Sequence, residues 1–234
     1  MNHHVYLGWI ASESRFDRDY FAASSQSYQF PYLYWPIYQM MRLEVPGWVA
    51  GVMWSCAHSL VAIPLWLCSK ALICEDGVVE TIFRLSGVVL SVGTILALRA
   101  PETTGNDLLA AIPYMFALAL GLQATRRDIP GRPFRKSVVT SIYMGLLVGV
   151  GVAFKLSNGV LAPLLVVPCF FMVQTWKSRI ALALSTVLSI GAGFLIVYGW
   201  WGWQLWLHFG NPVFPFADGL FQPLRSYLGW VPLY

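Results

Sequence analysis

The sequence predicts an all-α protein, a polytopic bundle of about six transmembrane helices with an aromatic outer loop that carries a short interfacial helix. Of its 234 residues, 57% are hydrophobic and only 11% are charged, whereas an ordinary soluble domain has roughly 25% charged residues. With a mean hydropathy of +0.61, the chain has too little polar surface to solvate a compact body of this size. These observations exclude a disordered chain and indicate that the solvent is mostly lipid.

Six apolar runs carry the prediction of spans, because a spanning helix needs about 20 mostly apolar residues. Bounded by charge, proline or glycine, they cover residues 46–69, 78–98, 106–124, 137–154, 158–175 and 180–207. The fourth and fifth runs are the shortest. The chain therefore divides into an N-terminal loop at 1–45, a transmembrane bundle at 46–207 and an exit loop at 208–234. Within the first loop, residues 26–41 combine dense aromatics with two prolines, which suits a helix lying in the headgroup layer.

Orientation follows from the basic loops, because Lys and Arg are retained on the cytoplasmic side. Residues 126–136 carry five of them, which places this loop, together with Lys70, Lys177 and Arg179, inside. The N-terminal loop, residues 100–105 and 155–157, and the exit loop then face outward. The formal net charge of +4 is spread between apolar runs instead of forming a basic stripe, so we expect no nucleic-acid partner.

Two carboxylates in the outer N-terminal loop are candidates for chemistry. Asp17 and Asp19 can act as a general base or hold a divalent cation. The alternative is a pair of solvated acids neutralised by the flanking Arg15 and Arg18.

Lys155 ends the fourth run at the outer face, and Ser157 and Asn158 are expected to cap the fifth helix at its N-terminus. A cation beside a helix N-terminus predicts a phosphate site. The alternative is a lysine that only snorkels to the interface.

Several further residues leave two interpretations open. The aromatic segment that contains Tyr28 is either an interfacial belt or one wall of a sugar or lipid groove. His58 lies mid-span, where an ionisable side chain raises a functional question, although a neutral imidazole bonded to a neighbouring helix also explains it. Glu80 and Arg84, four residues apart, predict a structural pair. The four cysteines have neither CxxC spacing nor a His cluster, so no residue is assigned to a metal.

Four short motifs, taken in chain order, resemble those of a bacterial family of C-type integral-membrane glycosyltransferases that use a polyprenyl-phosphate-linked sugar. His4-Val5-Tyr6, residues 15–19 and Gln26-Ser27-Tyr28 resemble the family's first outer loop. Residues 101–107 resemble its second outer turn, and residues 154–158 resemble its Leu-Lys-Leu-Thr-Asn junction. Residues 210–216 are similar to its Gly-Asn-Pro-x-Phe-Pro-Phe exit loop, the most specific of the four.

The resemblance implies a helical membrane fold with an outer-facing cavity for lipid phosphate, sugar and acceptor. It implies transfer of a sugar, with inversion, from a polyprenyl-phosphate donor to a hydroxyl of a glycan or lipid acceptor on the extracytoplasmic face of the inner (cytoplasmic) membrane. Asp19, with Asp17 second, would be the base and Lys155 the phosphate ligand. The remaining implied substrate-binding residues are Asn158, Asn211, Tyr28 and His4. The cofactor stays unknown.

Two other classes of protein stay open. Family members carry an acidic residue upstream of the His-x-Tyr segment and extend beyond the Phe-Pro-Phe loop, so we expect the chain to be incomplete at both ends. An inactive fragment or a non-catalytic membrane subunit would keep the packing and lose the site. A transporter would also be polytopic, but Glu80, Arg84 and His58 show none of the symmetry that paired halves predict.

Overall fold

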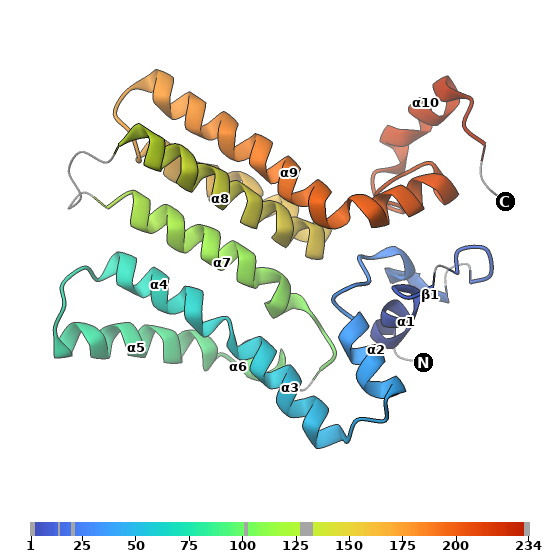
Figure 1. The fold of residues 1–234 in the computed structure, drawn as a ribbon, viewed down its shortest axis with the longest axis horizontal. Helices are drawn as coiled ribbons and strands as arrows, with labels where there is room; N and C mark the ends of the chain where they lie inside the picture. Colours follow the sequence, from blue (N-terminus) through green and yellow to red (C-terminus); the bar gives the residue numbers. More distant parts are fainter. Residues whose placement is uncertain (1–2, 14, 20–21, 101–102, 127–132, 232–234) are drawn as a thin grey trace. The chain divides into compact units, whose positions relative to one another are not determined.

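The fold is helical and divides into two compact units. The computed structural model describes residues 3–13, 15–19, 22–100, 103–126 and 133–231 (Figure 1). Residues 1–50 and 197–234 form one unit, here called the terminal unit, and residues 51–196 form the other, here called the bundle unit. In the described part of the chain, the four-residue strand β1 is the one element that is not a helix. The all-helical prediction is confirmed.

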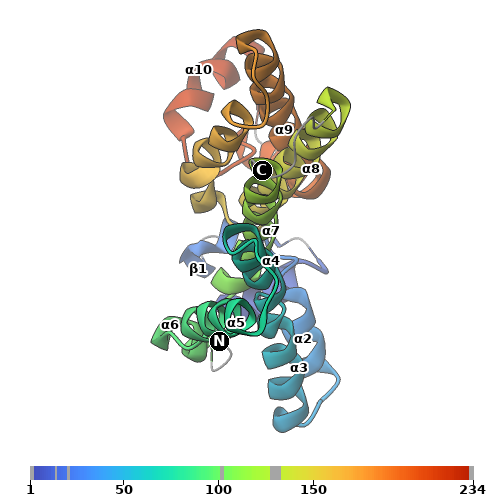
Figure 2. The same ribbon diagram turned by 90° about the vertical axis from the view of Figure 1, so that its left-hand side faces the viewer.

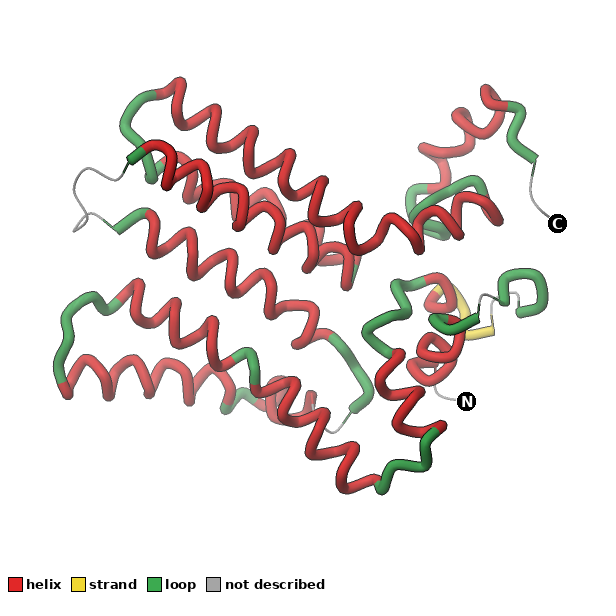
Figure 3. Tube along the Cα trace, in the orientation of Figure 1, coloured by secondary structure: helices red, strands yellow, loops and turns green. Residues whose placement is uncertain are grey.

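Figure 3 shows the helices in red, the strand in yellow and the loops in green. The terminal unit holds α1 (His3–Ile10), β1 (Ala22–Ser25), η1 (Gln26–Tyr28), α2 (Trp35–Arg42) and α10 (Asp218–Leu228). The bundle unit holds α4 (Ala62–Leu72), α5 (Val78–Val92), α6 (Ile95–Arg99), α7 (Asp107–Ala124), α8 (Phe134–Phe154) and the 3₁₀ helix η3 (Leu156–Phe170). The chain passes between the units within α3 (Gly47–Ser59) and α9 (Trp176–Phe209).

Four helical stretches in the described residues are long and apolar enough to cross a membrane. They are Gly47–Leu72, Asp107–Ala124, Phe134–Phe154 and Trp176–Phe209. The chain is therefore compatible with a multi-pass membrane protein. The expected number of about six spans is not confirmed, because the runs at 78–98 and 158–175 fold into shorter elements.

The run at 78–98 forms two helices, because α5 ends at Val92 and α6 begins at Ile95. Gly93 ends α5, and its amide donates to the carbonyl of Val89. The Thr94 hydroxyl then accepts from the amide of Ala97 at 3.3 Å, which caps the first turn of α6. A Gly-Thr step inside an apolar run thus produces two short helices instead of one long one.

The run at 158–175 is mostly 3₁₀ helix, with Pro163 and Pro168 inside it. Each proline lacks an amide donor and clashes with the carbonyl four residues earlier, which disfavours an α-helix. At a rise of about 2.0 Å per residue, a 3₁₀ helix as long as η3 reaches roughly 30 Å, the thickness of the hydrocarbon core. Although η3 has only 15 residues, its length in Å is therefore close to the thickness of the hydrocarbon core.

Arg84 holds the turn between α4 and α5. Its side chain is 4% exposed and donates to the carbonyls of Ile73 and Glu75 and, at 3.0 Å, to the carboxylate of Asp76. The structural role is as expected. The carboxylate that pairs with Arg84 is that of Asp76, from the preceding turn, in place of the expected Glu80.

The core of the bundle unit lies where α7, α8, η3 and the first half of α9 meet. Figure 1 and Figure 2 show α4 lying against α7 on the other side, and the contacts agree. The buried residues of this core are Tyr114, Ala117, Ala124, Met144, Val148, Leu165, Cys169, Met172 and Leu182. Most are small or flexible, which lets the helices approach one another closely.

Glycines make the closest approach, between α8 and α9. Gly145 and Gly149 form a Gly-xxx-Gly spacing on α8 that packs on the backbone of α9. A Cβ on Gly149 would lie 2.6 Å from the amide nitrogen of Phe194, and one on Gly193 would lie 2.9 Å from Cα of Leu146. Small residues at these positions allow backbone contact, the usual basis of helix pairing in lipid.

The outward faces of the bundle helices are apolar. Exposed side chains on α5 and α9 include Val79, Phe83, Leu90, Leu188, Leu195 and Ile196. Large apolar side chains exposed in this number are unusual on a soluble monomer. It supports the membrane setting.

The loops of the bundle unit gather at two opposite ends. Figure 1 shows the α4–α5 turn, the start of α8 and the start of α9 at one end, and the turn before α7 with the α8–η3 junction at the other. The sequence assigns these two sets to opposite sides of the membrane. Arg127 and Arg132 of the basic loop lie outside the described residues. Which end faces the cytoplasm stays a prediction.

Substitution of Gly193 with alanine tests the α8–α9 contact. We expect Gly193→Ala to lower the free energy of unfolding by roughly 1–3 kcal/mol, because the new methyl overpacks against Leu146. Gly191, on the same helix, has open space at its Cβ position, so Gly191→Ala should be neutral or stabilise by up to about 1 kcal/mol. Unfolding of the purified protein in detergent measures both. Equal effects of the two variants would contradict close packing at Gly193.

Candidate functional site

The predicted site residues fall into two groups. Lys155 and Asn158 lie in the bundle unit, whereas His4, Asp17, Asp19, Tyr28 and Asn211 lie in the terminal unit.

Asn158 joins three elements of the bundle unit. Its Nδ2 donates to the carbonyl of Gly151 at 3.1 Å and to that of Ala110 at 3.5 Å. Its own carbonyl accepts a 2.6 Å hydrogen bond from the Tyr114 hydroxyl. The expected N-terminal cap of η3 is wrong, because the structure gives η3 no side-chain cap bond at Lys155. Asn158 instead adds a second donor to the carbonyl of Gly151 in the last turn of α8, which also accepts from the amide of Lys155 at 3.3 Å.

Lys155 stands at the same junction and forms an ion pair with Asp107, the first residue of α7. The backbone of Lys155 is extended, with φ −151° and ψ 106°, so the chain turns away from the axis of α8 at this residue. Both partners are solvent-accessible, at 41% and 75% exposure, and an exposed pair of this kind contributes only about 0–1 kcal/mol. Little free energy is therefore lost when a ligand anion replaces Asp107 as the partner of Lys155.

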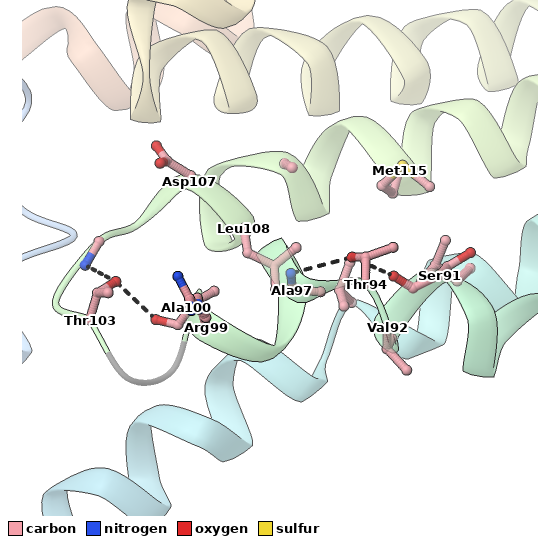
Figure 4. A pocket seen from close by; sticks show the side chains of 14 residues that line it. Ser91, Val92, Thr94, Ala97, Arg99, Ala100, Thr103, Asp107, Leu108 and Met115 are labelled. Atoms are coloured by element: carbon pink, nitrogen blue, oxygen red, sulfur yellow. Dashed lines mark hydrogen bonds between the residues drawn. The ribbon is translucent and has the colours of Figure 1, made fainter.

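Asp107 also lies at one end of a cavity of about 530 Å³, a size typical of ligand pockets. Figure 4 shows the lining residues on α5, α6, α7 and the turn between α6 and α7. The apolar lining residues are Val61, Leu65, Val92, Ala97, Ala100, Leu108, Ala111 and Met115. The polar ones are Ser91, Thr94, Arg99, Thr103 and Asp107. This combination fits an amphiphile, with an apolar chain and a small polar head.

The turn that closes this cavity is fixed by its own hydrogen bonds. The Thr103 hydroxyl donates to the carbonyl of Ala100 at 3.1 Å and accepts from the amide of Gly105 at 3.2 Å. The indole of Trp54 on α3 donates to the carbonyl of Thr103 at 3.0 Å. Pro101 and Glu102, which belong to the motif of this turn, lie outside the described residues.

His58 lies one turn beyond Trp54 and is 2% exposed. Its Nδ1 is 2.9 Å from the carbonyl of Trp54 and its ring packs edge-on against that indole. Since a carbonyl only accepts, Nδ1 carries the proton. Nε2 has no hydrogen-bond partner among the described residues. The bond within its own helix replaces the expected bond to a neighbouring helix.

Asp19 and Asp17 in the terminal unit are paired with arginines. Asp19 forms an ion pair with Arg15, and Asp17 pairs with Arg18 at 3.3 Å. The hydrogen bond from Arg15 holds the pKa of Asp19 below its ordinary value. A carboxylate whose pKa is lowered is a weaker proton acceptor, because a general base works best with a pKa near the working pH. This pairing matches the alternative that flanking arginines neutralise both acids; the catalytic role stays a prediction.

Tyr28 is buried inside the terminal unit. It is 1% exposed, its ring packs edge-on against Phe209 and Phe214, and its carbonyl accepts from the Trp201 indole at 3.0 Å. His4 stacks on Tyr34 with ring centroids 4.7 Å apart. The aromatic segment therefore supplies the core of this unit, an interpretation that the belt and groove alternatives did not include.

Asn211 closes the exit loop. Its Oδ1 accepts from the amide of Val213 at 3.0 Å, and its Nδ2 donates to the carbonyl of Phe216 at 2.9 Å and to Asp218 at 3.3 Å. The side chain is fully buried, and the Phe214–Pro215 peptide bond is cis. Residues 210–217 form a non-helical turn between α9 and α10.

Three residues of this site were missed by sequence reasoning. Arg99 lines the cavity, Asp107 pairs with Lys155, and Tyr114 binds Asn158. Asp107 did lie in a motif that carried the resemblance, which was a usable signal. The positions of Arg99 and Tyr114 gave no such signal.

Within the described part of the chain, no three His, Cys, Asp or Glu side chains lie close enough to hold a metal ion. Comparisons with protein-family models, with curated proteins and with solved structures find no match to this chain. The resemblance to membrane glycosyltransferases therefore stays a prediction.

Replacement of Asn158 with alanine tests its role at the helix junction. We expect Asn158→Ala to lower the free energy of unfolding by roughly 1–3 kcal/mol, because the helix junction loses both hydrogen bonds that the Asn158 side chain donates. The neighbouring Ser157 is exposed, so Ser157→Ala should change stability by less than about 0.5 kcal/mol. Thermal unfolding in detergent measures both, and an unchanged Asn158→Ala protein would refute the capping role.

Proposed function

We propose that this chain is a membrane glycosyltransferase that moves a sugar from a polyprenyl-phosphate donor to a hydroxyl of a glycan or lipid acceptor. The proposed setting is the extracytoplasmic face of a bacterial inner membrane. One observation carries the proposal. Lys155 and Asp107 come from two of the four motifs that resemble this family, they form an ion pair, and Asp107 also lines an apolar cavity.

The cavity suits each part of such a donor. The apolar walls would take the isoprenoid chain, whose burial is favourable at about 25 cal/mol per Å². Arg99 and Lys155 would bind the phosphate, because fixed cations stabilise the charge that develops on the leaving group. When the phosphate binds Lys155, the ion pair with Asp107 breaks, and the carboxylate of Asp107 becomes free beside the reacting centre.

The proposed reaction is a single displacement. A carboxylate accepts the proton of the acceptor hydroxyl, whose oxygen attacks the anomeric carbon. The bond between that carbon and the phosphate oxygen breaks, and its electron pair leaves with polyprenyl phosphate. The resemblance gives the base as Asp19 or Asp17. Among the described carboxylates, Asp107 is the one that lines the cavity.

A non-catalytic membrane subunit is the second candidate. Its support is that Tyr28, Asn158 and Asn211 are all engaged in internal packing or hydrogen bonds. These contacts explain the three residues without any substrate.

Lysine variants at the two ends of α8 test the proposed function. Lys155→Met should reduce transfer from short-chain polyprenyl-phosphate sugars by about 100-fold, because the leaving phosphate loses a fixed charge. Lys136 lies near the other end of α8, so Lys136→Met should leave transfer unchanged. Radiolabelled mannose, arabinose and glucose donors in detergent provide the assay. Absence of transfer by the wild-type protein with a membrane extract as acceptor source would favour the non-catalytic subunit.

Asparagine variants identify the base in the same assay. We expect Asp107→Asn to abolish transfer, because an amide does not accept the hydroxyl proton. Asp19→Asn should retain most of it, since the pKa of Asp19 is lowered by Arg15. The reverse pattern would restore Asp19 as the base.

A further inference from the structure

Helix α10 separates apolar from polar side chains along its length. At 100° per residue, Leu220, Leu224, Tyr227 and Leu228 fall on one side and Gln222 and Ser226 on the other. No residue of α10 is buried, and Leu220 and Tyr227 are 78% and 87% exposed. The apolar face therefore has no cover among the described residues of the terminal unit.

Contacts with the end of α9 position α10. Trp230, just after α10, packs on Trp206 of α9 with ring centroids 6.4 Å apart. Gly210, with φ +61°, lies so close to Arg225 that a Cβ there would be 2.8 Å from its Cγ. α10 therefore sits beside the C-terminal end of Trp176–Phe209, a helix that is long and apolar enough to cross a membrane.

The surrounding side chains are those of a membrane interface. Trp200 and Trp203 on the last turns of α9 are exposed, and exposed tryptophans gather at headgroup depth in membrane proteins. The polar face of α10 carries no net charge from its two ionic residues, because Arg225 binds Asp218 through bonds of 2.7 and 3.1 Å. The polar face of α10 therefore has no net positive charge that would attract anionic headgroups.

We propose that α10 lies in the plane of the membrane interface, with Leu220, Leu224, Tyr227 and Leu228 in the acyl-chain boundary. Apolar burial holds it there, and anionic lipid is not required. A second copy of the chain is the less suitable cover, because a helix of this length offers a face of about 16 Å by 10 Å, far below the roughly 800 Å² per partner of a stable complex. The inference is independent of the proposed function.

Depth measurements on the whole protein test this placement. Leu224→Cys and Gln222→Cys are prepared in a background where Cys56, Cys68, Cys74 and Cys169 are alanine, then spin-labelled and reconstituted in phosphatidylcholine vesicles. Collision with oxygen reports the acyl region, and collision with a water-soluble nickel chelate reports solvent. We expect the oxygen-to-nickel ratio to be several-fold higher at 224 than at 222. The ratio at 224 should be unchanged when phosphatidylglycerol makes up part of the lipid.

Three results would overturn the proposal. Equal ratios at 222 and 224 would mean that α10 does not lie in the interface. Protection of 224 from both reagents would mean that a second copy covers the face. A ratio at 224 that rises with phosphatidylglycerol would mean that charge holds the helix. Thermal unfolding confirms that each variant is folded, and Leu220→Cys replaces Leu224→Cys if it is not.

Discussion

Polar groups inside a bundle surrounded by lipid have no water to bind, so each one has to find its partner within the protein. In the bundle unit, several polar groups find such partners where helices end, whereas Nε2 of buried His58 has none among the described residues. Asn158 binds the carbonyl of Gly151, Tyr114 binds that of Asn158, and Lys155 pairs with Asp107. Arg84 does the same for the carbonyls of the α4–α5 turn. These contacts hold the ends of α7, α8 and η3 together, and the proposed site lies among them.

The cavity depends on the same helix ends. The Gly93-Thr94 step splits one apolar run into α5 and α6, and Ser91, Thr94 and Arg99 around this step line the cavity. The bond from Trp54 to Thr103 fixes the intervening turn. A continuous helix over residues 78–98 would carry these polar side chains elsewhere. An interruption that costs backbone hydrogen bonds therefore brings polar side chains into the wall of an otherwise apolar cavity, the combination that an amphiphile requires.

Composition and run length were sufficient to predict a helical membrane protein, because both follow from exposure to lipid. The number of spans was not predictable, because apolar content alone does not distinguish an α-helix from the proline-containing η3, nor reveal the stop at Gly93. For the site, the motif at residues 154–158 identified Lys155. Its partner Asp107 is 48 residues away, and no local pattern brings the two together. The Gly145–Gly149 spacing was visible in the sequence and indicates close packing, but only the backbone contacts reveal its partner α9.

The central claim is that the cavity beside Asp107 and Lys155 binds a polyprenyl phosphate. Photocrosslinking with a benzophenone-bearing polyprenyl phosphate, followed by peptide mapping, tests it most directly and does not depend on activity. The account predicts crosslinks to α4 and α7 near Leu65 and Met115, which excess unlabelled polyprenyl phosphate removes and Lys155→Met weakens. Crosslinks confined to the lipid-facing side of α9 near Leu188 and Ile196, and unaffected by competitor, would contradict it.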